Sequence, residues 1–104
     1  MTATVLILPG LGNSGPDHWQ SLWEKANPAF VRVQQRDWEH PVCEEWRQVL
    51  ERSVARAGAD AVLVAHSLAC LLVAHWAAGT SLKARGALLV APPDLERGDM
   101  PPQI

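Results

Sequence analysis

The alternation of four short apolar runs with three helical patterns constrains the fold of this chain more than any other feature. The runs cover residues 4–9, 30–33, 60–65 and 86–91. The first is rich in β-branched residues and continuously apolar, as in a strand that is buried on both faces, and the second is weaker. Strands that alternate with helices predict a parallel sheet with right-handed crossovers. The short links favour a three-layer, doubly wound α/β fold with its four strands in the order 2-1-3-4.

Apolar residues at helical spacing predict three helices between these strands. The first opens at Pro16, where the missing N–H costs nothing. The second covers residues 43–57 and ends at Gly58. The third, residues 68–78, is apolar on nearly all sides, so we expect it to be buried. Tryptophans on these helices are expected in the core rather than at a substrate; they are Trp19, Trp23, Trp46 and Trp76.

Length and charge limit the class of protein. A chain of 104 residues is one domain at most, and 48% hydrophobic residues are enough for a core. Its net charge is −2, which argues against a nucleic-acid partner and against a membrane-binding patch. The first apolar run is too short to span a membrane and resembles a strand, not a signal peptide. Cys43 and Cys70 have no metal or redox spacing, so we expect no metal, no cofactor and a cytoplasmic location.

The loop after the first predicted strand reads GLGNSG, residues 10–15. This G-x-G-x-x-G pattern, with Asp37 where a ribose-binding acid would fall, allows a dinucleotide-binding domain as one hypothesis. That fingerprint needs its third glycine inside the helix, against the strand. Here Pro16 follows Gly15 directly, so all three glycines belong to the loop. A loop that serves another chemistry is therefore favoured.

The turn after the third predicted strand reads AHSLA, residues 65–69, and joins strand to helix with no spare residues. This is the setting of a nucleophile elbow, in which a serine projects its hydroxyl above the sheet. A serine nucleophile also needs N–H donors for the oxyanion. Leu68 and, in the glycine loop, Leu11 could supply their backbone N–H groups. The alternative for Ser67 is a helix N-cap.

Four segments together resemble the small serine hydrolases of the retinoblastoma-binding-protein and YdeN type, which are compact α/β-hydrolases. They are VLILPGLGNSGPDHWQSLWE, QRDW, LVAHSLACLLVAHW and GALLVAPPD, between about residues 4 and 100. The resemblance implies an α/β-hydrolase fold and hydrolysis of a small-molecule ester, thioester or amide. It implies Ser67 as the nucleophile and the backbone N–H groups of Leu11 and Leu68 as the oxyanion hole. Ala69 stands where the family has glycine.

The resemblance also implies a triad acid and a histidine after the serine, in that chain order. No histidine follows His75, so we expect a single, truncated α/β-hydrolase domain over residues 1–104 that is nearly inactive by itself. If one of the four histidines replaced the expected base, His18 would be the best candidate. His66 is expected to pack beneath the turn, and Asp94 to form a turn rather than serve as the triad acid.

One non-enzymatic alternative stays open. A truncated sheet exposes a strand edge that can pair with another chain, so the chain could be a protein-binding α/β module.

Overall fold

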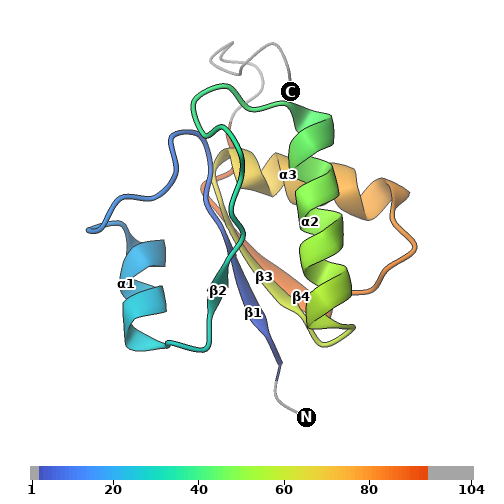
Figure 1. Cartoon of the computed structure of the whole chain (residues 1–104), viewed down its shortest axis with the longest axis horizontal. Helices are drawn as coiled ribbons and strands as arrows, with labels where there is room; N and C mark the ends of the chain where they lie inside the picture. Colours follow the sequence, from blue (N-terminus) through green and yellow to red (C-terminus); the bar gives the residue numbers. More distant parts are fainter. Residues whose placement is uncertain (1–2, 94–104) are drawn as a thin grey trace.

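The computed structural model describes residues 3–93. Its sheet has four parallel strands in the order β2-β1-β3-β4, which confirms the predicted order (Figure 1). The strands are β1 (Val5–Leu8), β2 (Val31–Arg32), β3 (Val62–His66) and β4 (Gly86–Val90). Each lies within the residues predicted for it or within two residues of them.

Three helices cover the two faces of the sheet. They are α1 (Trp19–Ala26), α2 (Cys43–Ala57) and α3 (Leu68–Gly79). In Figure 1, α1 lies on one side of the strands, while α2 and α3 lie together on the other. The predicted three-layer α/β arrangement is therefore confirmed. Because α1 is the one helix on its face, that face is less completely covered among the described residues.

The core lies between the sheet and the pair α2 and α3. Strand register sets Leu6 beside Leu63 and Leu8 beside Ala65, so these side chains share one face. They pack with buried residues of the two helices, which include Trp46, Leu50, Val54, Leu72, Val73 and Trp76. Full burial of one such side chain stabilises the fold by about 1.5–3 kcal/mol. This cluster is therefore the main source of stability.

Hydrogen bonds to Glu51 fasten α2 to the end of α3. The Glu51 carboxylate accepts from Trp76 Nε1 at 2.7 Å and from Thr80 Oγ1 at 2.6 Å. The hydrogen bond from Thr80, followed by that from Trp76, is the main cause that lowers the pKa of the Glu51 carboxyl below its usual range.

Only one side of α3 is buried, since Ala74, His75 and Ala77 are exposed. The expectation that this apolar helix is buried therefore holds for the side that faces the core and is wrong for the other side.

Helix α1 differs most from the sequence-based expectation. It begins at Trp19 rather than at Pro16, because His18 is its N-cap. The His18 Nδ1 accepts the Gln20 N–H at 3.1 Å. Trp23 is 40% exposed, and Trp19 is half-buried. The prediction that these two tryptophans lie in the core is therefore wrong. Trp46 and Trp76 are core residues, as predicted.

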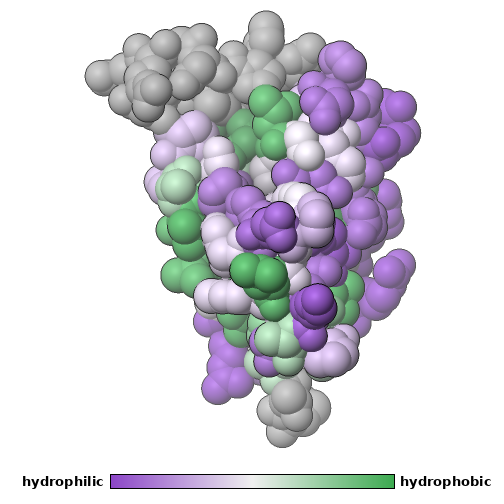
Figure 2. Space-filling view, turned by 90° about the vertical axis from the view of Figure 1, so that its left-hand side faces the viewer, coloured by the Kyte–Doolittle hydropathy of each residue, from purple (hydrophilic) through white to green (hydrophobic). Residues whose placement is uncertain are grey.

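The outer strand β4 is the least covered part of the sheet. Leu88 and Leu89 are 45% and 46% exposed, and they point to opposite faces because they are consecutive. On the side of α1, apolar residues appear in several separate places among hydrophilic ones (Figure 2). Within residues 3–93, no helix has the length and apolar character needed to cross a bilayer.

Candidate active site

Ser67 occupies the sharp turn between the last residue of β3, His66, and the first residue of α3, Leu68. Its backbone has φ +54° and ψ −119°, the conformation of the first central residue in a type II′ turn. Glycine adopts this region readily, whereas a side chain there is strained by about 1–3 kcal/mol. The Ser67 N–H donates to Val90 O at 2.9 Å, so β4 helps to hold the turn.

The Ser67 hydroxyl has no structural partner among the described residues. Ser67 occupies the N-cap position of α3, but its hydroxyl accepts no capping hydrogen bond, so this hydroxyl does not play the capping role considered for it. A cap would have explained the serine by stability alone. Instead, a strained and half-buried residue carries a hydroxyl that has no hydrogen-bond partner within residues 3–93. Unrelieved strain of this kind is characteristic of functional positions.

Replacing Ser67 by glycine tests the strain. We expect Ser67→Gly to raise the free energy of unfolding by about 1 kcal/mol, because relief of strain exceeds the entropic cost of glycine. Ser67→Ala keeps a Cβ at positive φ and should bring no gain. Urea unfolding of both variants measures the difference. Equal stability of the two variants would show that the turn holds no strain.

The glycine loop touches the turn at Gly10. A Cβ on Gly10 would lie 2.9 Å from His66 O and 3.2 Å from Leu68 N, so only glycine fits without a shift. Leu11 follows directly and is 49% exposed. Among the backbone hydrogen bonds of residues 3–93, none is donated by the N–H of Leu11 or of Leu68. The N–H groups of Leu11 and Leu68 therefore have no backbone acceptor within residues 3–93.

A buried glutamine that the sequence analysis did not identify holds this loop. Gln20 is 0% exposed. Its Nε2 donates to Leu8 O at 3.0 Å and to Val64 O at 3.1 Å, and its Oε1 accepts from Ser14 Oγ at 2.6 Å. One side chain therefore ties together β1, β3 and the glycine loop. The signal in the sequence is a polar residue, Gln20, directly after Trp19.

Arg32 on β2 supports the loop from the other side. Its guanidinium donates to Asn13 Oδ1 at 2.9 Å and to Ser14 O at 3.0 Å. The same group forms an ion pair with Glu24 of α1 at 2.5 Å. Arg32 thus connects β2, the glycine loop and α1. These contacts hold the loop more firmly than contacts within the loop alone would. Arg32 could not be identified from the sequence either, because its partners on the loop and on α1 are distant in the sequence.

None of the four histidines hydrogen bonds to Ser67. His66 points to the face of α1, where its ring centroid lies 4.5 Å from that of His18 and 5.9 Å from that of Trp19. This agrees with the expected packing role of His66. His18 caps α1, and His40 and His75 are exposed. Asp94 lies outside the described residues.

The pairing of His66 with His18 predicts a pH-dependent stability. Burial lowers the pKa of the His66 imidazole below its usual range, and the nearby His18 lowers it further. The folded state thus binds fewer protons at His66 than the unfolded state does, so stability falls as the pH drops below about 6.5. Thermal unfolding across this range should show the loss, and His66→Phe should reduce the slope. An unchanged slope would assign the pH dependence to other groups.

The geometry removes the support for dinucleotide binding at this loop. Helix α1 begins only at Trp19, and its Gln20 N–H is already bonded by His18. A Cβ on Gly15 would have open space around it, whereas the third glycine of the fingerprint packs against the strand. Asp37 accepts from the N–H groups of Glu39 and His40, both at 3.1 Å, and thus forms a turn.

The cysteines give no sign of a reactive or metal-bound thiol. Burial raises the pKa of both the Cys43 and the Cys70 thiol. A raised pKa keeps a thiol protonated and unreactive. In the part of the chain that the structure describes, no three side chains of His, Cys, Asp or Glu gather to hold a metal ion.

A parallel sheet with helices on both faces defines an α/β protein, with Ser67 at the carboxyl end of β3 and a glycine loop at the neighbouring β1. Comparison with known proteins gives the family. The family model described as serine hydrolase matches residues 5–104, and the chain belongs to the serine hydrolase family. The resemblance inferred from the sequence motifs is thus confirmed.

A solved structure is similar over nearly the whole chain. It is that of a YdeN-like hydrolase from Pectobacterium atrosepticum, with 30% sequence identity and a TM-score of 0.83. The match covers 99% of this chain and 56% of that protein, so the chain spans little more than half the length of its relative. No curated protein matches the chain.

Proposed function

We propose that the protein is an acyl hydrolase in which Ser67 is the nucleophile. The observation that carries this proposal is the strained φ of +54° at Ser67, with Gly10 in close contact with the turn. A nucleophile elbow needs this conformation, since it exposes the hydroxyl at the carboxyl end of the sheet. Membership of the serine hydrolase family supports the same chemistry.

In the proposed reaction, Ser67 Oγ attacks the carbonyl carbon of an ester, thioester or amide. Its proton passes to a base, and the C–O bond forms as the carbonyl oxygen becomes an oxyanion. The N–H groups of Leu11 and Leu68 stabilise that oxyanion. The leaving group departs with the proton, and water then releases the acid from Ser67. Each oxyanion donor contributes on the order of 10²–10³ in rate.

None of the four histidines hydrogen bonds to Ser67 within residues 3–93: His18 caps α1, His66 contacts His18, and His40 and His75 are exposed. A serine hydroxyl without a base is a weak nucleophile. We therefore propose that the 104-residue chain hydrolyses esters very slowly by itself. Imidazole in solution can substitute for a missing histidine side chain, and this makes the proposal testable on the chain.

The experiment is labelling with a fluorophosphonate, which acylates activated serines, followed by intact mass and peptide analysis. We expect one slow adduct on Ser67 and faster labelling with added imidazole. Ser67→Ala should take no adduct. Ser53→Ala removes a hydroxyl from α2, far from the turn, and should label like the parent chain. A folded chain that takes no adduct on Ser67, with or without imidazole, would contradict the proposal and favour a protein-binding role.

A further inference from the structure

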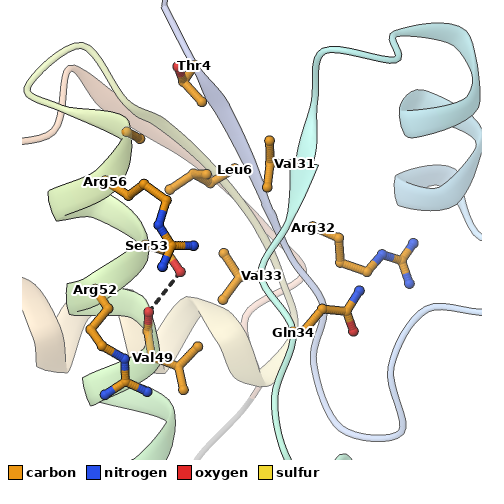
Figure 3. A pocket seen from close by; sticks show the side chains of 11 residues that line it. Thr4, Leu6, Val31, Arg32, Val33, Gln34, Val49, Arg52, Ser53 and Arg56 are labelled. Carbon is orange, nitrogen blue, oxygen red and sulfur yellow. Dashed lines mark hydrogen bonds between the residues drawn. The ribbon is translucent and has the colours of Figure 1, made fainter.

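A groove lies between β2 and α2, away from Ser67. Its volume is about 390 Å³, within the range of small-molecule sites. Leu6 and Val33, which are 2% and 3% exposed, are the deepest residues of its lining, and Val31 and Val49 add further apolar surface. In Figure 3 these four side chains lie between the helix and the strand. The groove thus offers an apolar floor that is open at the surface.

Two arginines of α2, Arg52 and Arg56, border this floor. Figure 3 shows the Arg56 side chain lying beside Ser53 of the same helix, at the α2 side of the groove, while Arg32 points away toward α1. Within residues 3–93, neither Arg52 nor Arg56 forms an ion pair. The arginines that do pair with glutamates are Arg32, Arg36 and Arg47. Like charges four residues apart on a helix destabilise it slightly, so this pair has no evident role in stability.

The chemistry of the lining selects the ligand. We propose that the groove binds a single-chain carboxylate, with its aliphatic body on Leu6, Val33 and Val49 and its head group at Arg52 and Arg56. Guanidinium groups bind carboxylates through paired, charge-assisted hydrogen bonds. Small hydrophilic anions are not the preferred ligands, because they would leave the apolar side chains of the groove exposed to water.

This site is separate from the proposed acyl-hydrolase site. The groove is lined by Thr4 and Leu6 at β1, by residues 31–34 along and after β2, and by α2 from Val49 to Ala57. Ser67, which follows the carboxyl end of β3, is not among these residues. We therefore expect binding of a carboxylate in the groove not to require Ser67.

The test is titration of the full chain with decanoate, followed by calorimetry and by amide chemical shifts. We expect shifts at Val31, Val33 and Val49. Arg52→Gln combined with Arg56→Gln should weaken binding on the order of tenfold or more, because two charged hydrogen-bond donors are lost. Lys83→Gln combined with Arg85→Gln removes the same charge outside the groove and should bind like the parent chain.

Two further arms keep the test decisive. Val49→Phe fills the groove and should also weaken binding, even if the arginine variant folds poorly. Decyltrimethylammonium has the same chain with a cationic head, and we expect it not to bind in the groove. Equal binding of this cation, unchanged decanoate affinity in the arginine variant, or no binding at all would overturn the proposal. Shifts at Leu11 and Leu68 or at Leu88 in place of the groove residues would overturn it too.

Discussion

Gly10→Ala is expected to lower the free energy of unfolding by about 3 kcal/mol, because the added Cβ meets backbone atoms that cannot rotate away. Those atoms are His66 O at 2.9 Å and Leu68 N at 3.2 Å from the Cβ position. Either the glycine loop or the turn at Ser67 must move. For a domain of this size, about 4–8 °C is lost per kcal/mol, so the melting temperature should fall by roughly 15 °C. Thermal and urea unfolding measure both quantities.

Gly15→Ala in the same loop is the matched control. A Cβ on Gly15 would have nothing within 4 Å, and its φ lies outside the left-handed region. Alanine at such a position stabilises a protein by about 0.4–1 kcal/mol, through the unfolded state. The contrast between the two variants separates the two interpretations of the G-x-G-x-x-G pattern. Greater damage from Gly15→Ala than from Gly10→Ala would favour a dinucleotide fingerprint, in which the third glycine packs closely.

Secondary structure and strand order could be predicted from the sequence because they depend on local patterns. Apolar runs of four to six residues form the strands, of which β1 and β3 are the buried ones, and the helical period of residues 43–57 matches α2 (Cys43–Ala57). Gly58 ends α2 with φ +92°, as its position predicts. The alternation of strands and helices then leaves few topologies, and the right-handed crossover rule selects among them.

The orientation of α1 could not be predicted because it depends on contacts between distant segments. Helical spacing identifies Trp19, Leu22 and Trp23 as one apolar face, yet Leu22 and Trp23 are 50% and 40% exposed. Gln20 is buried instead, since its amide bonds to carbonyls of β1 and β3. A pattern of hydrophobicity contains no information about a polar side chain that finds its partners in the core.

In the candidate site, too, some features could be predicted from local sequence motifs, whereas others depend on contacts between distant segments. The motif AHSLA identifies Ser67, and the close approach of Gly10 agrees with a loop that serves the turn. Backbone strain at Ser67 could not be read from residue types, since alanine rather than glycine flanks the serine at two positions. The hydrogen bonds and the ion pair that join Arg32 to Asn13, Ser14 and Glu24 could not be predicted either, because these residues are far from Arg32 in the sequence.

Gln20→Leu is expected to lower the free energy of unfolding by about 3 kcal/mol, although leucine has a similar size and is more hydrophobic. Leucine removes the two N–H donors to Leu8 O and Val64 O and the acceptor of the Ser14 hydroxyl. Each buried polar group that loses its partner costs about 1–3 kcal/mol. The glycine loop should also lose its tie to the sheet, so fluorophosphonate labelling of Ser67 should slow.

Gln35→Leu is the control for this substitution. Gln35 is 8% exposed, and its Oε1 is buried without a hydrogen-bond partner among the described residues. Leucine at this position removes an unsatisfied group, so stability should stay the same or rise. Urea unfolding of both variants gives the comparison. If Gln20→Leu were as stable as Gln35→Leu, the hydrogen bonds of Gln20 would not hold the loop. The position of Gly10 beside the turn would then depend on packing alone.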